Sequence, residues 1–103
     1  MKDRLQLVML LDFYSNLLKD HGRQVMIDFA EHDLSISEIA QKNGVTRQAV
    51  LDTIKKQGQK LEEFEDKLQL VSRFSRAREL LLELKQSADG ATKKKIEQIL
   101  DIL

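Results

Sequence analysis

The chain contains no proline in its 103 residues. Proline interrupts helices and is frequent in turns, so its absence favours long, continuous helices. Hydrophobic residues make up 42% of the sequence and charged residues 33%, which is enough apolar material to build a core. A chain of this length is expected to form one compact body rather than two ordinary domains. The sequence therefore predicts a compact, all-α protein.

The residue types that carry most catalytic and metal chemistry are scarce. There is no cysteine, which excludes disulfides, thiol catalysis and cysteine-based metal sites. The two histidines, His21 and His32, are too far apart in sequence to form a helical metal-ligand pair. His32 beside Asp33 is more typical of a polar pair at a helix end than of a catalytic dyad. We expect no enzyme, no catalytic residues, no metal and no cofactor.

The chain also lacks the features of a membrane or exported protein. No apolar run approaches the ~20 residues that a membrane-spanning helix needs. The opening Met1–Arg4 is charged and amphipathic, unlike a signal peptide. We therefore expect a cytoplasmic protein without a membrane partner.

The charge is uneven along the chain although it sums to zero, with 17 basic and 17 acidic residues. Residues 34–60 carry five basic side chains against two acidic ones, whereas the segments on either side have a small acidic excess. A net-positive middle segment permits binding to a polyanion such as nucleic acid.

Apolar residues recur every three or four positions along most of the chain, which is the helical period. Helices are expected at about 2–19, 21–32, 36–43, 47–71, 73–88 and 92–103, with 73–88 either separate or a continuation of the preceding helix. Asp20 is placed to cap the second helix and Thr46 the fourth. Ser35 and Glu38 form a capping-box pattern that begins the third. A turn is expected at Asp89–Gly90.

Three residues have the spacing of a helix-turn-helix motif. Ala40 supplies a small residue where two helices cross, Gly44 suits the tight turn, and Val50 anchors the second helix. The rest of the small core is expected from Ile36, Ile39, Val45 and Ile54. A plain helical hairpin within a bundle is the alternative interpretation of the same spacing.

The expected start of the second motif helix carries residues that suit nucleic acid. Arg47 is suited to guanine or phosphate and Gln48 to adenine. Thr46 is suited to a phosphate or a thymine methyl group. Phosphate contacts are expected from Lys42, Lys55, Lys56 and Lys60. Leu51 and Asp52 are unusual on such a surface, and the motif also serves as a docking unit for protein or RNA.

The run 34–50 resembles region 4 of bacterial sigma-70-type sigma factors. More closely, the whole chain resembles the YlxM family of small bacterial helix-turn-helix proteins. The matching segments are 12–18, the helix start at 46–50, and 54–68, and the similarity covers about 5–74.

The resemblance has two departures and one functional implication. Ala49, Leu51 and Asp52 replace polar residues that sigma factors often carry, so promoter recognition of the sigma kind is not expected. Gly22 replaces a more helix-favouring residue at the start of the second helix. The family is encoded beside signal-recognition-particle genes. The resemblance therefore implies a DNA-binding regulator linked to that pathway or, alternatively, an accessory protein that docks on the particle's RNA or protein.

The predicted organisation is a sigma-70 region 4-like helix-turn-helix domain over 1–60, with the motif at about 35–56, followed by a long helical arm and hairpin over 61–103. Apolar residues continue at heptad-like spacing from Val50 to Val71. A long amphipathic arm favours self-association, so we expect a homodimer. The dimer seam is predicted at Leu61, Phe64, Leu68 and Val71.

Overall fold

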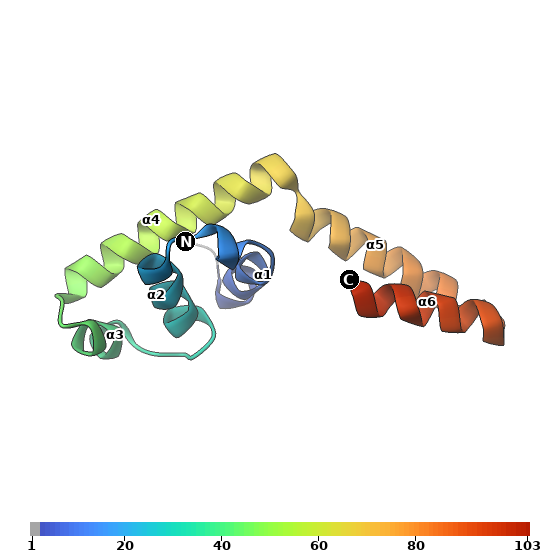
Figure 1. Ribbon diagram of the computed structural model, residues 1–103, viewed down its shortest axis with the longest axis horizontal. Coiled ribbons are helices and arrows are strands. Elements are labelled where there is room, and N and C mark those ends of the chain that lie inside the picture. Colours follow the sequence, from blue (N-terminus) through green and yellow to red (C-terminus); the bar gives the residue numbers. More distant parts are fainter. Residues whose placement is uncertain (1–2) are drawn as a thin grey trace. The chain divides into compact units, whose positions relative to one another are not determined.

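The computed structural model describes residues 3–103, which form six α-helices and one 3₁₀ turn without any β-strand. The elements are α1 (Arg4–Tyr14), η1 (Ser15–Leu17), α2 (Asp20–Ala30), α3 (Ile36–Asn43), α4 (Arg47–Leu68), α5 (Leu70–Gln86) and α6 (Gly90–Ile102) (Figure 1). The all-α fold class is confirmed. The chain divides into two compact units, one ending at Leu68 and one beginning at Gln69, whereas the predicted boundary at 60/61 lies inside α4.

In the first unit, α4 is the common support on which α1, α2 and α3 pack (Figure 1). Its buried residues, Val50, Ile54 and Leu61, recur at the spacing of one helix face. The helices opposite bury the residues Leu7, Leu10, Leu11, Tyr14, Val25, Met26, Ala30, Ile39 and Ala40. Because each large apolar side chain buried in this way contributes about 1.5–3 kcal/mol, this shared face holds the three shorter helices in place.

A second set of contacts joins α1 to the last turns of α4. The hydroxyl of the buried Tyr14 donates a hydrogen bond to Glu65 Oε1 at 2.6 Å. The rings of Tyr14 and Phe64 lie 5.9 Å apart between centroids. Leu61 and Phe64, two residues of the predicted dimer seam, therefore pack within the first unit itself.

The beginning of the chain differs from the predicted helix at 2–19. Lys2 lies outside the described residues, and α1 ends at Tyr14, after which Ser15–Leu17 form a 3₁₀ turn. Serine and asparagine are weak helix formers, and such turns are common at helix ends. Asp20 is not the cap of α2, because Lys19 occupies that position and Asp20 lies in the first turn. Its carboxylate still interacts favourably with the positive end of the helix dipole.

The fourth helix is shorter than the predicted 47–71. It ends at Leu68 because Gln69 adopts a left-handed conformation with φ of 56°, which no helix interior accepts. Val71 consequently belongs to α5, and the predicted seam is not one continuous helical stripe. The segment expected at 73–88 is a separate helix, α5.

The second unit is the hairpin of α5 and α6. The last helix begins at Gly90 rather than near Thr92, because the side chain of Asp89 accepts a hydrogen bond from the Thr92 backbone N–H at 3.0 Å and caps the helix there. Lys85 and Glu97 form an ion pair across the hairpin at 3.4 Å. Among the described residues of this unit, Ile96 alone is fully buried, whereas five large apolar residues are exposed: Leu80, Leu82, Leu84, Ile99 and Ile102.

Candidate nucleic-acid interface

The turn between α3 and α4 is defined at both ends by local hydrogen bonds. Ser35 Oγ accepts from the Glu38 backbone N–H at 3.1 Å, and Glu38 Oε1 accepts from the Ser35 N–H at 3.0 Å. Hydrogen bonds to the Glu38 carboxylate, first from the Ser35 backbone N–H and then from the Ser35 side chain, lower the pKa of Glu38. The predicted capping box is therefore confirmed as the start of α3.

The other end of α3 stops at a left-handed glycine. Gly44 has φ of 65°, and its N–H bonds back to the Gln41 carbonyl. The next N–H, of Val45, bonds to the Ala40 carbonyl at 3.0 Å. This pair of bonds is a Schellman motif, which closes a helix in a compact turn. The predicted role of Gly44 is confirmed.

The helix crossing that follows is that of a helix-turn-helix. Ala40 and Val50 are both buried, as the motif requires, together with Ile39 and Ile54. Val45 was also expected in this core, but it is 43% exposed. The reason is local: Val45 lies in the turn directly after the left-handed residue, where its backbone N–H is bonded inward.

The first turn of α4 lies at the surface. Thr46 Oγ1 accepts a hydrogen bond from the Ala49 backbone N–H at 3.0 Å and so caps the helix, as predicted. Arg47 and Gln48 follow it and are exposed. Arg47 has no ion-pair partner within residues 3–103. Its full charge is available to an external anion.

One turn later the same surface carries an acidic and an apolar residue. Gln48 Nε2 donates a hydrogen bond to Asp52 Oδ1 at 2.9 Å, so that the two side chains are joined along the helix. Leu51 lies between them in sequence and is 45% exposed. The surface that begins α4 is therefore mixed in chemistry rather than uniformly basic.

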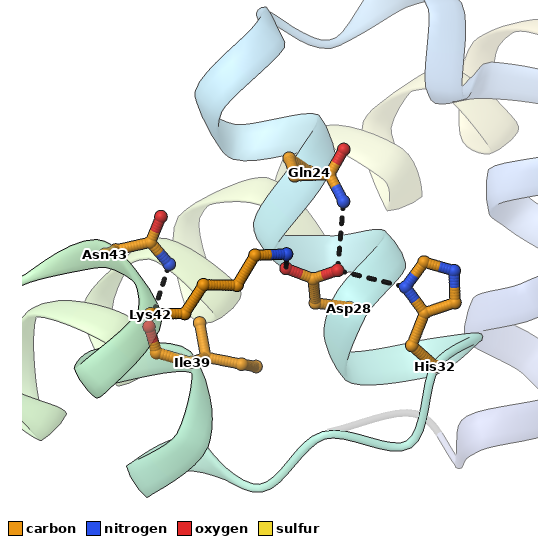
Figure 2. A network of polar contacts seen from close by, with 6 residues as sticks. All are labelled: Gln24, Asp28, His32, Ile39, Lys42 and Asn43. Carbon is orange, nitrogen blue, oxygen red and sulfur yellow. Dashed lines mark hydrogen bonds and ion pairs between the residues drawn. The ribbon is translucent and has the colours of Figure 1, made fainter.

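The charge of Lys42 is paired within the chain. Figure 2 shows Lys42, Gln24 and His32 converging on Asp28, a carboxylate of α2 whose side chain is only 1% exposed. Lys42 Nζ lies 2.8 Å from Asp28 Oδ2, and Gln24 Nε2 and His32 Nδ1 lie 2.9 and 3.0 Å from Oδ1. Burial raises the pKa of Asp28, but these contacts, first the hydrogen bond from Lys42, outweigh it and lower the pKa overall.

This network ties the first helix of the motif to α2. Lys42 belongs to α3, so its ion pair with Asp28 fixes α3 against the helix before it. The neighbouring Asn43 adds a hydrogen bond within α3 from Nδ2 to the Ile39 carbonyl at 2.8 Å (Figure 2). Although the Lys42 side chain is half exposed, its charge already has a partner.

The remaining predicted lysines lie on two faces of α4. Lys55 and Lys56 are both exposed and make no ion pair among the residues that the structure describes. Successive residues of a helix are about 100° apart, so the two ammonium groups point in different directions. Lys55 shares its face with Gln48 and Leu51, and Lys56 does not. The structure thus brings Gln48 and Lys55 together and separates Lys56 and Lys42 from them.

Comparison with known proteins identifies the family of this chain. Residues 1–102 match the model of a family described as "Putative helix-turn-helix protein, YlxM / p13 like". The chain belongs to this family. The resemblance to this family drawn from the sequence is confirmed.

Relatives from several bacteria align over nearly the whole chain. A UPF0122 protein of Malacoplasma penetrans is 41% identical over 99 residues, covering 94% of this chain and 92% of the relative. UPF0122 proteins of Halalkalibacterium halodurans and Fusobacterium nucleatum are 40% and 39% identical, each over 91% of this chain and over 87% and 88% of their own lengths. The second unit is therefore part of what this YlxM/p13-like family shares.

A hollow of about 670 Å³ runs along the exposed face of α4 in this helix-turn-helix protein. Its wall on α4 includes Gln48, Leu51, Asp52 and Lys55, and the other side is contributed by α1, α2 and α3 through Leu7, Phe29 and Ile36. Apolar residues thus form much of its lining. A partly apolar hollow beside the start of the second motif helix was not predicted, because it depends on how four helices assemble.

Two other structural features were not predicted from the sequence. Asp28 was not singled out, and only its i,i+4 spacing to Gln24 and His32 is visible in the sequence. Gly22, predicted only to weaken α2, has a packing role: a Cβ at this position would lie 2.6 Å from Gln57 Cδ on α4. The absence of a side chain lets α2 approach α4 at this point.

Residues 3–103 contain no group of three or more histidine, cysteine, aspartate or glutamate side chains that could hold a metal ion. Within the same residues, no helix combines the length and the apolar character that crossing a bilayer requires.

Proposed function

We propose that this protein binds double-stranded DNA through α4 and acts as a regulator of gene expression. The observation that carries the proposal is the first turn of α4, where Thr46, Arg47 and Gln48 follow a helix-stop turn and lie exposed. In a helix-turn-helix, the first residues of the second helix reach base edges in the major groove. Arg47 is then suited to a guanine or a phosphate, and Gln48 to an adenine.

Electrostatics supports the same surface. Lys55 and Lys56 add two unpaired charges to that of Arg47, so α4 can contact phosphates on both sides of the reading residues. Lys42 contributes differently in this proposal. Its charge is used to hold α3 against Asp28, so we expect it to position the motif more than to bind phosphate.

Titration of a fluorescent duplex with the full chain tests the proposal. Arg47→Ala removes one charge-assisted contact and should weaken binding by about 1–3 kcal/mol while lowering the salt dependence of the affinity by about one phosphate contact. Arg78→Ala, which removes an exposed arginine of α5 that has no ion pair within residues 3–103, is the matched control and should leave the affinity nearly unchanged. Equal effects of the two substitutions would contradict the assignment of Arg47.

A second candidate function is docking on the RNA or protein of the signal recognition particle, which the family resemblance implies. The partly apolar hollow beside Leu51 and Phe29 favours it, because exposed apolar surface is typical of protein contacts. Retention of genomic DNA and of signal-recognition-particle RNA on the immobilised protein at two salt concentrations separates the two functions. DNA retention that Arg47→Ala abolishes supports the first, and retention of the particle's RNA or protein that this substitution leaves intact supports the second.

We further propose that the protein is a homodimer. The second unit has 35 residues, and units below about 40 residues usually need a partner, a metal or disulfides to be stable. Its exposed apolar residues on α5 and α6, among them Leu80, Leu84 and Ile102, provide surface for a second copy. This assignment moves the expected contact away from Leu61 and Phe64, which pack inside the first unit.

A further inference from the structure

The bond between Gln48 and Asp52 determines which hydrogen-bonding groups this part of α4 presents. Because the bond ends on a carboxylate oxygen, the Gln48 amide nitrogen faces Asp52, and the Gln48 carbonyl oxygen is left free. The second carboxylate oxygen of Asp52 also remains free, since neither it nor Gln48 has any other side-chain partner among the described residues. The pair thus offers acceptors, the one Gln48 amide N–H that Asp52 does not engage, and a full negative charge.

Leu51 adds an apolar group to the same face. It is 45% exposed, and it lines the hollow together with Gln48 and Asp52. Acceptor oxygens therefore lie directly beside an aliphatic side chain, over little more than one turn of helix.

Base pairs differ in how well they match such a surface. In the major groove adenine N6 and cytosine N4 each present an amino donor, thymine adds the 5-methyl group, and guanine presents two acceptors, N7 and O6. Acceptors on the protein attract the amino group of adenine or cytosine, and the leucine packs on the methyl group, which only an A·T pair carries. The guanine acceptors meet the Asp52 carboxylate and are repelled.

We propose that Asp52, joined to Gln48, rejects guanine on the DNA strand that it faces, and that Leu51 favours A·T base pairs through the thymine methyl group. The proposal rests on the proposed function, since it requires that α4 enters the major groove. Lys55 is the remaining cation on this face, but it lies two turns into α4, where we assign it to a phosphate. We likewise assign Arg47, at the beginning of α4, to a phosphate.

Selection of binding sites from a random duplex library by the full chain gives the first test. The selected sites should be enriched in A·T pairs at consecutive positions, and guanine should be absent from one strand at the position that Asp52 faces. For Asp52→Asn, whose amide can donate to guanine O6, the same selection should admit guanine on that strand. Asp101→Asn, an exposed aspartate of α6, is the matched control and should select the same sites as the unchanged protein.

A double-mutant cycle with modified DNA gives the second test. Replacing thymine by uracil removes only the 5-methyl group and should weaken binding of the unchanged protein about fourfold, the value of one buried methyl-sized group. Leu51→Ala should weaken binding to the thymine duplex by a similar factor and make the protein insensitive to the replacement. Circular dichroism should show the same helicity and melting for Leu51→Ala, because Leu51 is partly exposed.

The outcomes separate this inference from the function on which it rests. Salt-sensitive duplex binding without an A·T preference, or with a preference that Asp52→Asn and Leu51→Ala leave unchanged, overturns the inference and leaves DNA binding intact. Absence of salt-sensitive binding to any duplex contradicts DNA binding itself, and the inference with it.

Discussion

Asp28 is buried yet charged, and three side chains contact it: Gln24 of α2, His32 of the turn after α2, and Lys42 of α3. We predict that Asp28→Asn lowers the free energy of unfolding at pH 7 by about 1–3 kcal/mol, because the Lys42 ammonium loses its charged partner. Urea denaturation followed by circular dichroism measures the change. Asp12→Asn, at an exposed aspartate of α1, is the control and should change the stability little. An unaltered stability for Asp28→Asn would show that the network does not hold α3.

The difference in stability between the unchanged protein and Asp28→Asn should depend on pH. The folded state lowers the pKa of Asp28 below its ordinary value of 3.8. The carboxylate therefore stabilises the fold fully above that value, and the stabilisation is lost as the pH falls through it toward the folded pKa. We expect the advantage of Asp28 over Asp28→Asn to be constant from neutral pH to about pH 5 and to shrink below pH 4. A gap that stays constant down to pH 3 would contradict this.

Gly22 and Gln57 are a second pair whose effect is local. A Cβ on residue 22 would collide with the side chain of Gln57, which is buried and whose Oε1 has no hydrogen-bond partner within residues 3–103. Gly22→Ala should therefore destabilise the protein by about 1 kcal/mol despite the better helix propensity of alanine. In a Gln57→Ala background the same substitution should be neutral or stabilising. Stabilisation by Gly22→Ala alone would contradict the close approach of α2 and α4.

At the scale of the elements, the sequence predicts boundaries well where the signal is local. The capping box at Ser35 and the left-handed Gly44 lie within a few residues of the ends that they define. The end of α4 was missed because the residue that stops it is Gln69, a type without a preference for positive φ, while the apolar period continues beyond it.

The turn joining α3 and α4 gives a prediction at the same scale. Gly44→Ala should lower the stability by about 1–2 kcal/mol, because alanine resists φ of 65°. A Cβ there would meet no atom within 4 Å, so the backbone conformation alone sets the effect. Gly44→Asn should lose less than Gly44→Ala in thermal denaturation, since asparagine tolerates this conformation. Equal losses would indicate that side-chain contacts, rather than backbone strain, determine the change in stability.

For the molecule as a whole, the candidate site was predictable in part. The spacing of Ala40, Gly44 and Val50 identifies the motif, and it places Thr46 to Gln48 at the surface without any structure. The partner of Lys42 is 14 residues away on another helix, and the hollow needs four helices, so neither could be inferred from periodicity. Such contacts appear only when the elements assemble.

The proposed dimer is also tested at this scale. Sedimentation equilibrium at tens of micromolar should give twice the mass of the 11.9 kDa chain. Leu80→Glu and Ile102→Glu place charges on exposed apolar positions of α5 and α6 and should shift the protein toward the monomer. Lys93→Glu, at an exposed polar position of α6, is the control and should remain dimeric. A monomer for the unchanged chain would contradict the proposal.

The central claim is that the exposed start of α4 meets DNA. Nuclear magnetic resonance of the ¹⁵N-labelled full chain, titrated with a short duplex at low salt, tests it most directly. We predict that the backbone amide signals of Thr46, Arg47, Gln48 and Lys55 shift together and return toward their free positions as salt is added. Shifts confined to α5 and α6, or no shift at any residue of α4, would contradict the account.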